Sequence, residues 1–118
     1  MFETLGEAMQ AGQAIDALGA LAQEHRLKLF RLLVQAGGEG MAAGDLARAI
    51  DIPNSSLSFH LGQLQRAGLI EQRRAGRSLI YSADYRAMDR LVAYLMENCC
   101  GGAGCAPTSV CESEREVP

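Results

Sequence analysis

The sequence has no run of about 18 apolar residues, the length that a membrane-spanning helix requires. It also lacks a basic N-terminal segment followed by an apolar core, so we find no secretory signal. Internal repeats are absent. With 118 residues, 48% hydrophobic and 21% charged, the composition is typical of a small globular domain. We therefore expect a soluble, cytoplasmic protein with one functional unit.

An excess of positive charge is missing too, since the formal net charge is −3. The acidic residues are unevenly placed, because the first 24 residues carry four carboxylates and neither lysine nor arginine. Residues 48–90 instead carry seven arginines and four carboxylates, a local net charge of +3. A basic surface for nucleic acid is therefore expected in this second region. A patch of this size predicts salt-sensitive binding, best achieved by a dimer that doubles the phosphate contacts.

Residues 51–69 predict a recognition helix, around which we expect the chain to be organised. One apolar stripe recurs at helical spacing and consists of Leu57, Leu61 and Leu64. Pro53 and Asn54 suit the first turn of the helix, and Gly68 supplies the left-handed residue that ends it. The short polar side chains at the leading end are able to hydrogen-bond base edges in the major groove, and Phe59 is able to contact a thymine methyl.

Two strand-like runs, residues 70–74 and 78–83, predict a hairpin, or wing, directly after this helix. Its tip carries three arginines, which we expect to hold phosphates: Arg73, Arg74 and Arg77. The alternative is a helix-turn-helix that packs against protein, with these arginines merely solvated.

Four further helices are expected, at residues 2–21, 25–34, 43–50 and 84–98, with glycines breaking the chain at 35–41. Asp84 suits the N-cap of the last helix. That helix carries a broad apolar stripe: Tyr85, Met88, Leu91, Val92, Leu95 and Met96. We expect the first and last helices to bury their apolar faces against a second subunit, giving a homodimer. Alternatively, the last helix closes over its own core.

Three cysteines follow the last predicted helix, Cys99, Cys100 and Cys105, with Cys111 beyond. The glycine-rich segment between them lets three sulfurs approach one point, and thiolates select soft ions such as As(III) or Sb(III). Zinc prefers four ligands, which Cys111 would complete. A disulfide from Cys105 to Cys99 or Cys100, or an idle tail, is the alternative. Because the cluster follows a helix C-terminus beside Glu97, we expect ligands rather than catalytic nucleophiles, and no enzyme.

The chain resembles the ArsR/SmtB family of winged-helix metal- and metalloid-responsive repressors over about residues 18–98. Four segments carry the resemblance: LGALAQEHRLKLFRLL (18–33), DLARA (45–49), SSLSFHLGQLQRAGLI (55–70) and RRAGRSLIY (73–81). The resemblance implies a mainly α winged helix-turn-helix with a small β-hairpin, forming a homodimer that represses double-stranded operator DNA until an inducer binds. It also implies which residues contact DNA: Asn54, Ser55, Ser56, Ser58, Phe59 and His60, with Arg74 and Arg77 on the wing.

Two known inducer sites of the family have no counterpart here. The positions of the arsenic site in the third helix hold Ala42, Gly44 and Ala47, and three zinc-ligand positions of the last helix hold Tyr85, Ala87 and Asn98. The cysteines after the last helix remain, similar to family members that sense arsenite at this end. His25 and His60 are far from these cysteines in the sequence and are not counted as ligands.

We therefore predict a DNA-binding and dimerisation domain at residues 1–98 and a cysteine-bearing tail at 99–118. The predicted function is repression that is relieved when As(III), or Sb(III), binds Cys99, Cys100 and Cys105, without an organic cofactor. The alternatives are the same fold sensing an organoarsenical, zinc or another thiophilic metal, thiol oxidation or a persulfide. A thiol-based arsenate reductase is disfavoured, because no cysteine lies at an evident helix N-terminus or anion-binding loop.

Overall fold

The computed structural model describes residues 9–102 of the chain. Its elements in chain order are α2 (Ala11–Leu21), α3 (Glu24–Ala36), the 3₁₀ helix η1 (Gly37–Glu39), β1 (Met41–Ala42), α4 (Ala43–Ile50), α5 (Asn54–Arg66), β2 (Ile70–Ala75), β3 (Ser78–Ala83), α6 (Tyr85–Leu95) and α7 (Cys99–Gly102). This order confirms the predicted winged helix-turn-helix. None of the helices in residues 9–102 combines the length and apolarity needed to cross a bilayer.

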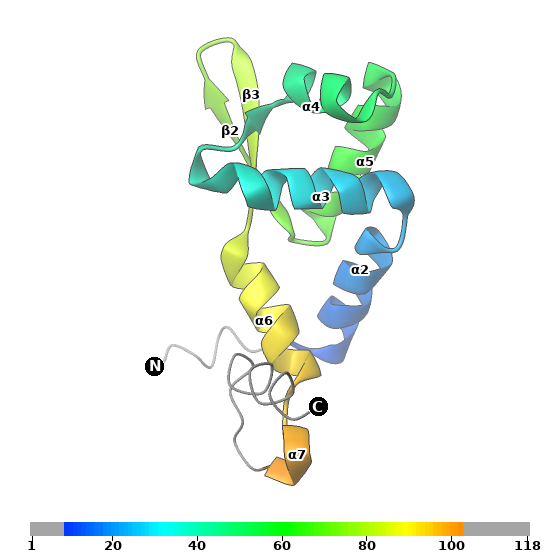
Figure 1. Ribbon diagram of the computed structural model, residues 1–118, viewed down its shortest axis with the longest axis vertical. Coiled ribbons are helices and arrows are strands. Elements are labelled where there is room, and N and C mark those ends of the chain that lie inside the picture. The colour runs from blue at the N-terminus through cyan, green and yellow to red at the C-terminus, as the bar shows by residue number, and fades with distance from the viewer. Residues whose placement is uncertain (1–8, 103–118) are drawn as a thin grey trace, which may run out of the picture.

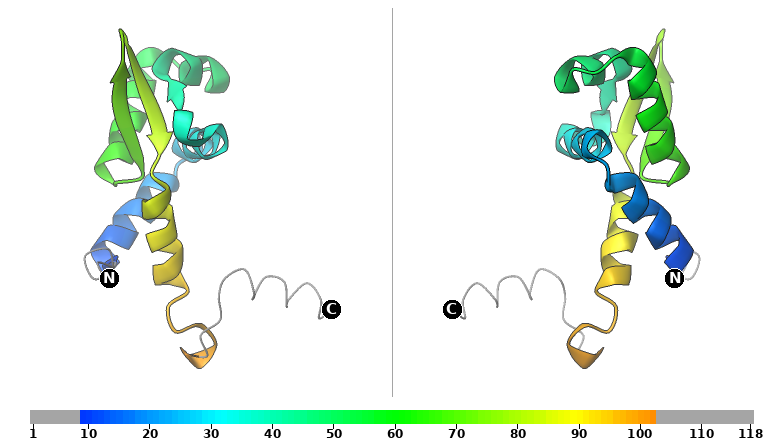
Figure 2. Two further views of the ribbon diagram at one scale, coloured as in Figure 1. Left: turned by 90° about the vertical axis from the view of Figure 1, so that its left-hand side faces the viewer. Right: turned by 90° about the vertical axis from the view of Figure 1, so that its right-hand side faces the viewer.

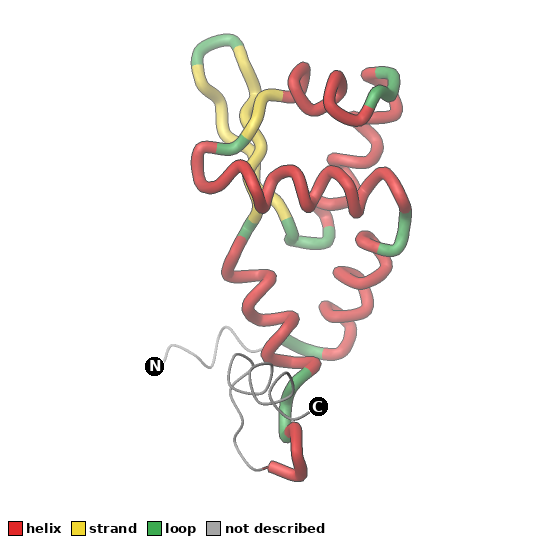
Figure 3. The backbone as a smooth tube through the Cα atoms, in the orientation of Figure 1, coloured by secondary structure: helices red, strands yellow, loops and turns green. Residues whose placement is uncertain are grey.

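Helix α3 crosses the middle of the molecule and separates two regions (Figure 1). Helix α4 and the tip of the β2–β3 hairpin lie on one side of α3, α5 and the base of the hairpin pass behind it, and α2 and α6 extend from its other side. The side views agree that α7 lies at the end of the molecule opposite the hairpin (Figure 2). Strands are confined to the neighbourhood of the hairpin (Figure 3). The two cysteines of α7 are thus remote from the predicted DNA-binding elements.

Leucines from α3, α4, α5 and the turn after α5 form the centre of the core. The most deeply buried side chains are Leu29, Leu33, Leu46, Leu64 and Leu69. The predicted stripe of α5 is confirmed, because all three of its leucines are buried. Burying a leucine stabilises the fold by about 1.5–3 kcal/mol relative to leaving it exposed. This core fixes α5 against α3 and leaves its opposite face available for contacts.

Helix α5 ends as predicted. Gly68 has a φ of +80°, and the Leu69 N–H donates to the carbonyl of Leu64 over 3.0 Å. The left-handed glycine and this back-bond are features of a Schellman-type C-terminus, in which a following apolar residue packs back on the helix. Leu69 is buried accordingly. The chain therefore leaves α5 in the direction of β2 and sets the place of the wing.

The sheet has three strands rather than the predicted two. Strands β2 and β3 form the expected hairpin. Strand β1 begins at the end of the glycine-containing segment 35–41, where only a break between helices was expected, and it pairs antiparallel with β3. Gly40 has a φ of +74°, and a Cβ there would lie 2.2 Å from the carbonyl oxygen of Tyr81. A glycine with this backbone brings Met41 opposite Tyr81, a pairing too short to produce a strand-like sequence pattern.

The first predicted helix is shorter within the described residues than expected. Helix α2 begins at Ala11, after Gln10, whose N–H donates to the side-chain oxygen of Gln13 over 2.8 Å. The remaining predicted positions, residues 2–8, lie outside the described residues. Its buried face consists of alanines: Ala14, Ala17 and Ala20. Small side chains on this face permit a close approach of α2 to α3 and α5.

The last predicted helix is also shorter, since α6 ends at Leu95 rather than near Asn98. Its start is confirmed, because the Asp84 carboxylate accepts a hydrogen bond from the Ala87 N–H over 3.1 Å. The predicted end near Asn98 was wrong because the chain turns after Leu95, and Asn98 itself has a φ of +59°. The cysteines therefore open a separate helical turn, α7, instead of continuing from the last turn of α6.

Candidate nucleic-acid interface

The N-terminal half of α5 presents polar side chains to solvent. Asn54, Ser55 and Ser58 are exposed, and Ser56 is half-buried. Phe59 is 56% exposed although it is apolar, so burial in the monomer does not explain its place. Short hydroxyl and amide groups beside an exposed ring provide hydrogen bonds for base edges and an apolar contact for a thymine methyl. The arrangement agrees with the predicted role of these residues, which remains a prediction.

His60 differs from its neighbours because other side chains hold it. Its Nδ1 lies 3.3 Å from a terminal nitrogen of Arg26, and its ring lies 5.4 Å from that of His25 and 5.5 Å from that of Phe59. Burial, followed by Arg26 and His25, lowers the pKa of His60 below its ordinary value of 6.5. The ring is thus neutral at pH 7, and because arginine only donates, Nδ1 accepts and Nε2 carries the proton.

Arg26 joins three helices at this point. Its Nε donates to the carbonyl of Ala20 at the end of α2 over 2.7 Å, and its guanidinium reaches His60 on α5. The last carbonyls of a helix lack intrahelical partners, so this bond also caps α2. This contact was not predicted, because Arg26 and His60 are 34 residues apart in the chain. The observed contact makes His60 a residue that fixes α5 on α3, besides its predicted contact with DNA.

The wing carries its arginines as expected, but they have different surroundings. Arg74 and Arg77 are exposed, and Gly76, with a φ of +64°, stands at the first position of the two-residue turn. A glycine with positive φ is required there in a type II′ turn. Arg73 instead donates to the carbonyl of Glu39 over 2.7 Å and ties the wing to η1. Arg74 and Arg77 are therefore the better placed for phosphates.

Large apolar side chains of α2 and α6 lie exposed on the side of α3 away from the wing. Ile15 is 67% and Leu95 56% exposed, and Leu18 and Val92 are exposed too. The two helices contact each other within the monomer. Because burial of such residues stabilises an association, this face is the best candidate for contact with a second copy.

Helix α6 is tied to α3 by a hydrogen bond that the sequence did not reveal. The Tyr85 hydroxyl donates to the carbonyl of Val34 over 2.8 Å. Val34 lies in the last turn of α3, where carbonyls lack intrahelical partners. The first turn of the candidate dimer helix is thereby joined to the helix that supports α5.

The predicted thiol cluster is described in part. Cys99 is half-buried and Cys100 exposed, and both belong to α7, with Cys100 at a φ of +56°. Cys105 and Cys111 lie outside the described residues. Within residues 9–102, no group of three or more histidine, cysteine or acidic residues is placed to hold a metal ion. The predicted three-sulfur set includes Cys105, so the described part of the chain does not test it.

Several matches to known proteins bear on this interface. A helix-turn-helix domain model matches residues 21–73. The chain is 34% identical over 91 residues to the "Putative arsenical resistance operon repressor ArsR" of Halobacterium salinarum, covering 74% of this chain and 70% of that protein. It is 31% identical over 90 residues to the HTH-type transcriptional regulator YgaV of Escherichia coli, covering 76% and 89%.

Among solved structures, the chain is similar to the homodimeric winged helix-turn-helix DNA-binding domain of a Mycobacterium bovis protein. The TM-score is 0.58 with 30% sequence identity, and the match covers 74% of this chain and 81% of that domain. Both named relatives are transcriptional regulators. The matched segments contain α3, α4, α5 and the start of the wing, the elements that carry the predicted DNA contacts.

Proposed function

Because the chain belongs to the ArsR/SmtB family of winged-helix transcriptional regulators, we propose that it represses an operator as a dimer and is released by trivalent arsenic. The proposed ligands are the thiolates of Cys99, Cys100 and Cys105. Antimony(III), which is also thiophilic, is expected to act in the same way. The observation that carries the proposal is the adjacent cysteine pair directly beyond α6, the helix with an exposed apolar face.

The DNA-binding part of the proposal is supported by exposure and charge. Residues with base-compatible side chains are exposed along α5, and Arg74 and Arg77 are exposed on the hairpin. In a winged helix the recognition helix enters the major groove, so the hairpin arginines are able to reach flanking phosphates. The concentration of arginine in residues 48–90 supplies the positive field that the whole chain lacks. Operator binding is therefore expected to weaken steeply with salt.

The dimer is supported by the exposed face of α2 and α6. A palindromic operator presents two equivalent half-sites, and a two-fold dimer places one α5 at each of them. The Mycobacterium bovis domain to which the chain is similar is a homodimer. We propose the same association here, through α2 and α6, which leaves α5 and the wing clear of the interface (Figure 1).

The inducer is supported by the donor set and by one relative. Two vicinal thiols with a third five or six positions on offer three soft ligands, which suit three-coordinate As(III) better than a hard cation. The relative from Halobacterium salinarum is named for arsenical resistance. Because α7 lies at the opposite end from the wing, arsenic must act on DNA binding through α6, and Tyr85 provides a contact from α6 to α3.

Cysteine variants test the ligand set. Operator binding by the full chain is followed by fluorescence anisotropy during arsenite titration, for wild type, Cys99→Ser, Cys100→Ser, Cys105→Ser and Cys111→Ser. Serine keeps the size of the side chain and removes the soft ligand. We expect the first three variants to bind operator as wild type does but to ignore arsenite, and the matched control Cys111→Ser to respond normally. Release that survives in Cys99→Ser or Cys100→Ser would refute the proposed site.

The same variants separate the alternatives that share this fold. If wild type responds to phenylarsine oxide but not to arsenite, and Cys105→Ser keeps that response, two thiols suffice and an organoarsenical is the inducer. A response to Zn²⁺ that requires Cys111 would identify a four-ligand zinc site. A thiol-redox regulator would be released from operator by peroxide or polysulfide but not by arsenite, and the release would be accompanied by a dithiol-to-disulfide mass change.

A further inference from the structure

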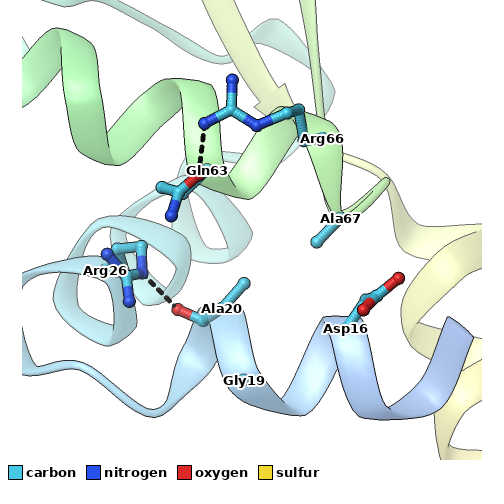
Figure 4. A pocket seen from close by; sticks show the side chains of 7 residues that line it. All are labelled: Asp16, Gly19, Ala20, Arg26, Gln63, Arg66 and Ala67. Atoms are coloured by element: carbon cyan, nitrogen blue, oxygen red, sulfur yellow. Dashed lines mark hydrogen bonds between the residues drawn. The ribbon is translucent and has the colours of Figure 1, made fainter. Parts of the chain in front are cut away.

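A polar pocket of about 310 Å³ lies between α2, α3 and α5, apart from both the wing and the cysteines. Its polar lining comes from Asp16, Arg26, Gln63 and Arg66, and its floor includes Gly19 and Ala20. Figure 4 shows α5 above the pocket and α2 below it, with Arg26 towards one end and Asp16 towards the other. Pockets of this size accept small molecules.

The two arginines retain hydrogen-bond donors for a ligand. A guanidinium carries five N–H groups. Arg26 uses its Nε on the Ala20 carbonyl and one terminal nitrogen on His60, and Arg66 donates to the side-chain oxygen of Gln63. These bonds orient both planar groups without exhausting them, so each is able to pair with a carboxylate in a fork.

Asp16 supplies the complementary charge. Its side chain makes no hydrogen bond or ion pair with any residue of the described range 9–102. The pocket thus presents two positive groups and one negative group on three different helices. Two carboxylates and one ammonium would satisfy all three groups.

We propose that this pocket binds a small amino dicarboxylic acid, with its carboxylates on Arg26 and Arg66 and its ammonium on Asp16. The amino dicarboxylate carries a net charge of −1 and neutralises the +1 of the three lining groups. The apolar floor at Gly19 and Ala20 leaves room for a short methylene chain, because a Cβ on Gly19 would meet nothing within 4 Å.

A ligand in this pocket acts on the recognition helix through Arg26. That side chain touches the end of α2 through Ala20 and touches α5 through His60. Arg66 and Gln63 are themselves residues of α5. Ligand binding therefore favours one placement of α5 relative to α2, and operator affinity changes by the same factor by which operator changes ligand affinity.

Isothermal titration calorimetry of the full chain with L-glutamate and L-aspartate tests the proposal. We expect L-glutamate and L-aspartate to bind saturably. Glutarate, which lacks the ammonium, and γ-aminobutyrate, which lacks one carboxylate, should bind at least tenfold more weakly than L-glutamate. Arg66→Gln is expected to weaken L-glutamate binding tenfold or more. Asp16→Asn should remove the preference for L-glutamate over glutarate. No binding of either amino acid at about 10 mM, or binding unchanged in Arg66→Gln, would overturn the proposal.

A pair of glycine variants separates a ligand pocket from a contact between copies of the chain. Gly19→Met projects into the pocket, and Gly12→Met, also on α2 and also with open space at its Cβ, does not line it. We expect Gly19→Met to abolish L-glutamate binding and Gly12→Met to leave it intact, with neither changing the sedimentation of the protein. If Gly19→Met alone weakens self-association, a second copy fills the pocket and the proposal is wrong.

Discussion

Gly40 occupies a position that only glycine fits. Its φ of +74° disfavours any side chain, and a Cβ would lie 2.2 Å from the Tyr81 carbonyl oxygen. The neighbouring Gly38 has neither restriction, since nothing lies within 4 Å of a Cβ built there. The contrast lets the cost of one methyl group be measured at two sites in the same turn.

Gly40→Ala is expected to lower the free energy of unfolding by about 2–4 kcal/mol, because the left-handed backbone and the collision with Tyr81 both act against it. Gly38→Ala is the control and should change it by less than about 1 kcal/mol. Urea denaturation of the two variants makes the comparison. Equal stabilities would show that β1 does not pair with β3 as described.

His60 makes stability depend on pH in a predictable direction. Burial, Arg26 and His25 lower its pKa in the folded state, so the folded protein binds a proton there less readily than the unfolded chain. The stabilising contribution of the neutral ring is therefore fully present above the unfolded pKa of 6.5 and is lost as pH falls through the folded pKa.

His60→Gln tests this dependence, because glutamine keeps an acceptor for Arg26 and does not titrate. We expect the urea midpoint of wild type to fall more between about pH 7.5 and pH 5 than that of the variant. A steeper fall in His60→Gln than in wild type would reverse the assigned sign.

Among the elements, α6 links the exposed apolar face, the cysteines and α3. Its first turn is held by Asp84 and by the bond from Tyr85 to Val34, and α7 begins four residues after its last residue. Any effect of Cys99 and Cys100 on α5 therefore has a physical route through α6 and α3, which contacts α5 directly.

Tyr85→Phe removes only the hydroxyl of this link. Loss of the bond to Val34 is expected to cost about 0.5–1.5 kcal/mol of stability and to reduce the factor by which arsenite weakens operator binding. Tyr94→Phe, on the same helix, is the control, since its hydroxyl makes no hydrogen bond within residues 9–102. Denaturation and anisotropy titration measure both effects. An arsenite response equal in the two variants would exclude this route.

Most elements were predicted because each one has a signal in its own stretch of sequence, such as an apolar period or a capping residue. The leucine period and Gly68 defined α5, the two strand-like runs at 70–74 and 78–83 defined the wing, and Asp84 defined the start of α6. The two-residue strand β1 was missed because it depends on Tyr81, about 40 residues away. The early end of α6 was missed because the apolar period continues through Met96 while the backbone turns.

Site residues were predictable from the sequence only where a single helix or hairpin determines their exposure. Exposed serines, Phe59 and the wing arginines follow from helix and hairpin geometry. The contacts of Arg26 with Ala20 and His60, and the pocket beside them, depend on how α2, α3 and α5 pack together. Local sequence patterns do not determine that packing, so neither feature was predicted. The same holds for Tyr85, which looked like part of an apolar stripe and uses its hydroxyl instead.

At the scale of the whole molecule, the predicted DNA-binding residues and the proposed inducer ligands lie at opposite ends. The wing and the start of α5 lie at one end, and the cysteines of α7 at the other (Figure 1). The face of α2 and α6 lies between them. A dimer through that face would hold the two α5 helices and their wings at a fixed separation. An inducer bound at α7 would need to change that separation to release the operator.

Leu95→Glu is expected to separate this dimer, because it places a charge on a residue that is 56% exposed in the monomer and buried in the proposed interface. Leu27→Glu, at a similarly exposed leucine of α3, is the control. Sedimentation velocity should show a monomer only for Leu95→Glu, with operator affinity falling in parallel. A dimer that persists in Leu95→Glu would place the interface elsewhere.

The central claim is that arsenic at the cysteines weakens the hold of the dimer on DNA. The most direct measurement is the dissociation constant of the wild-type protein for the DNA upstream of its own gene, with and without saturating arsenite at fixed salt. We predict a weakening of about tenfold or more, matched by an equal weakening of arsenite binding when operator is present. An operator dissociation constant that arsenite leaves unchanged would contradict the account.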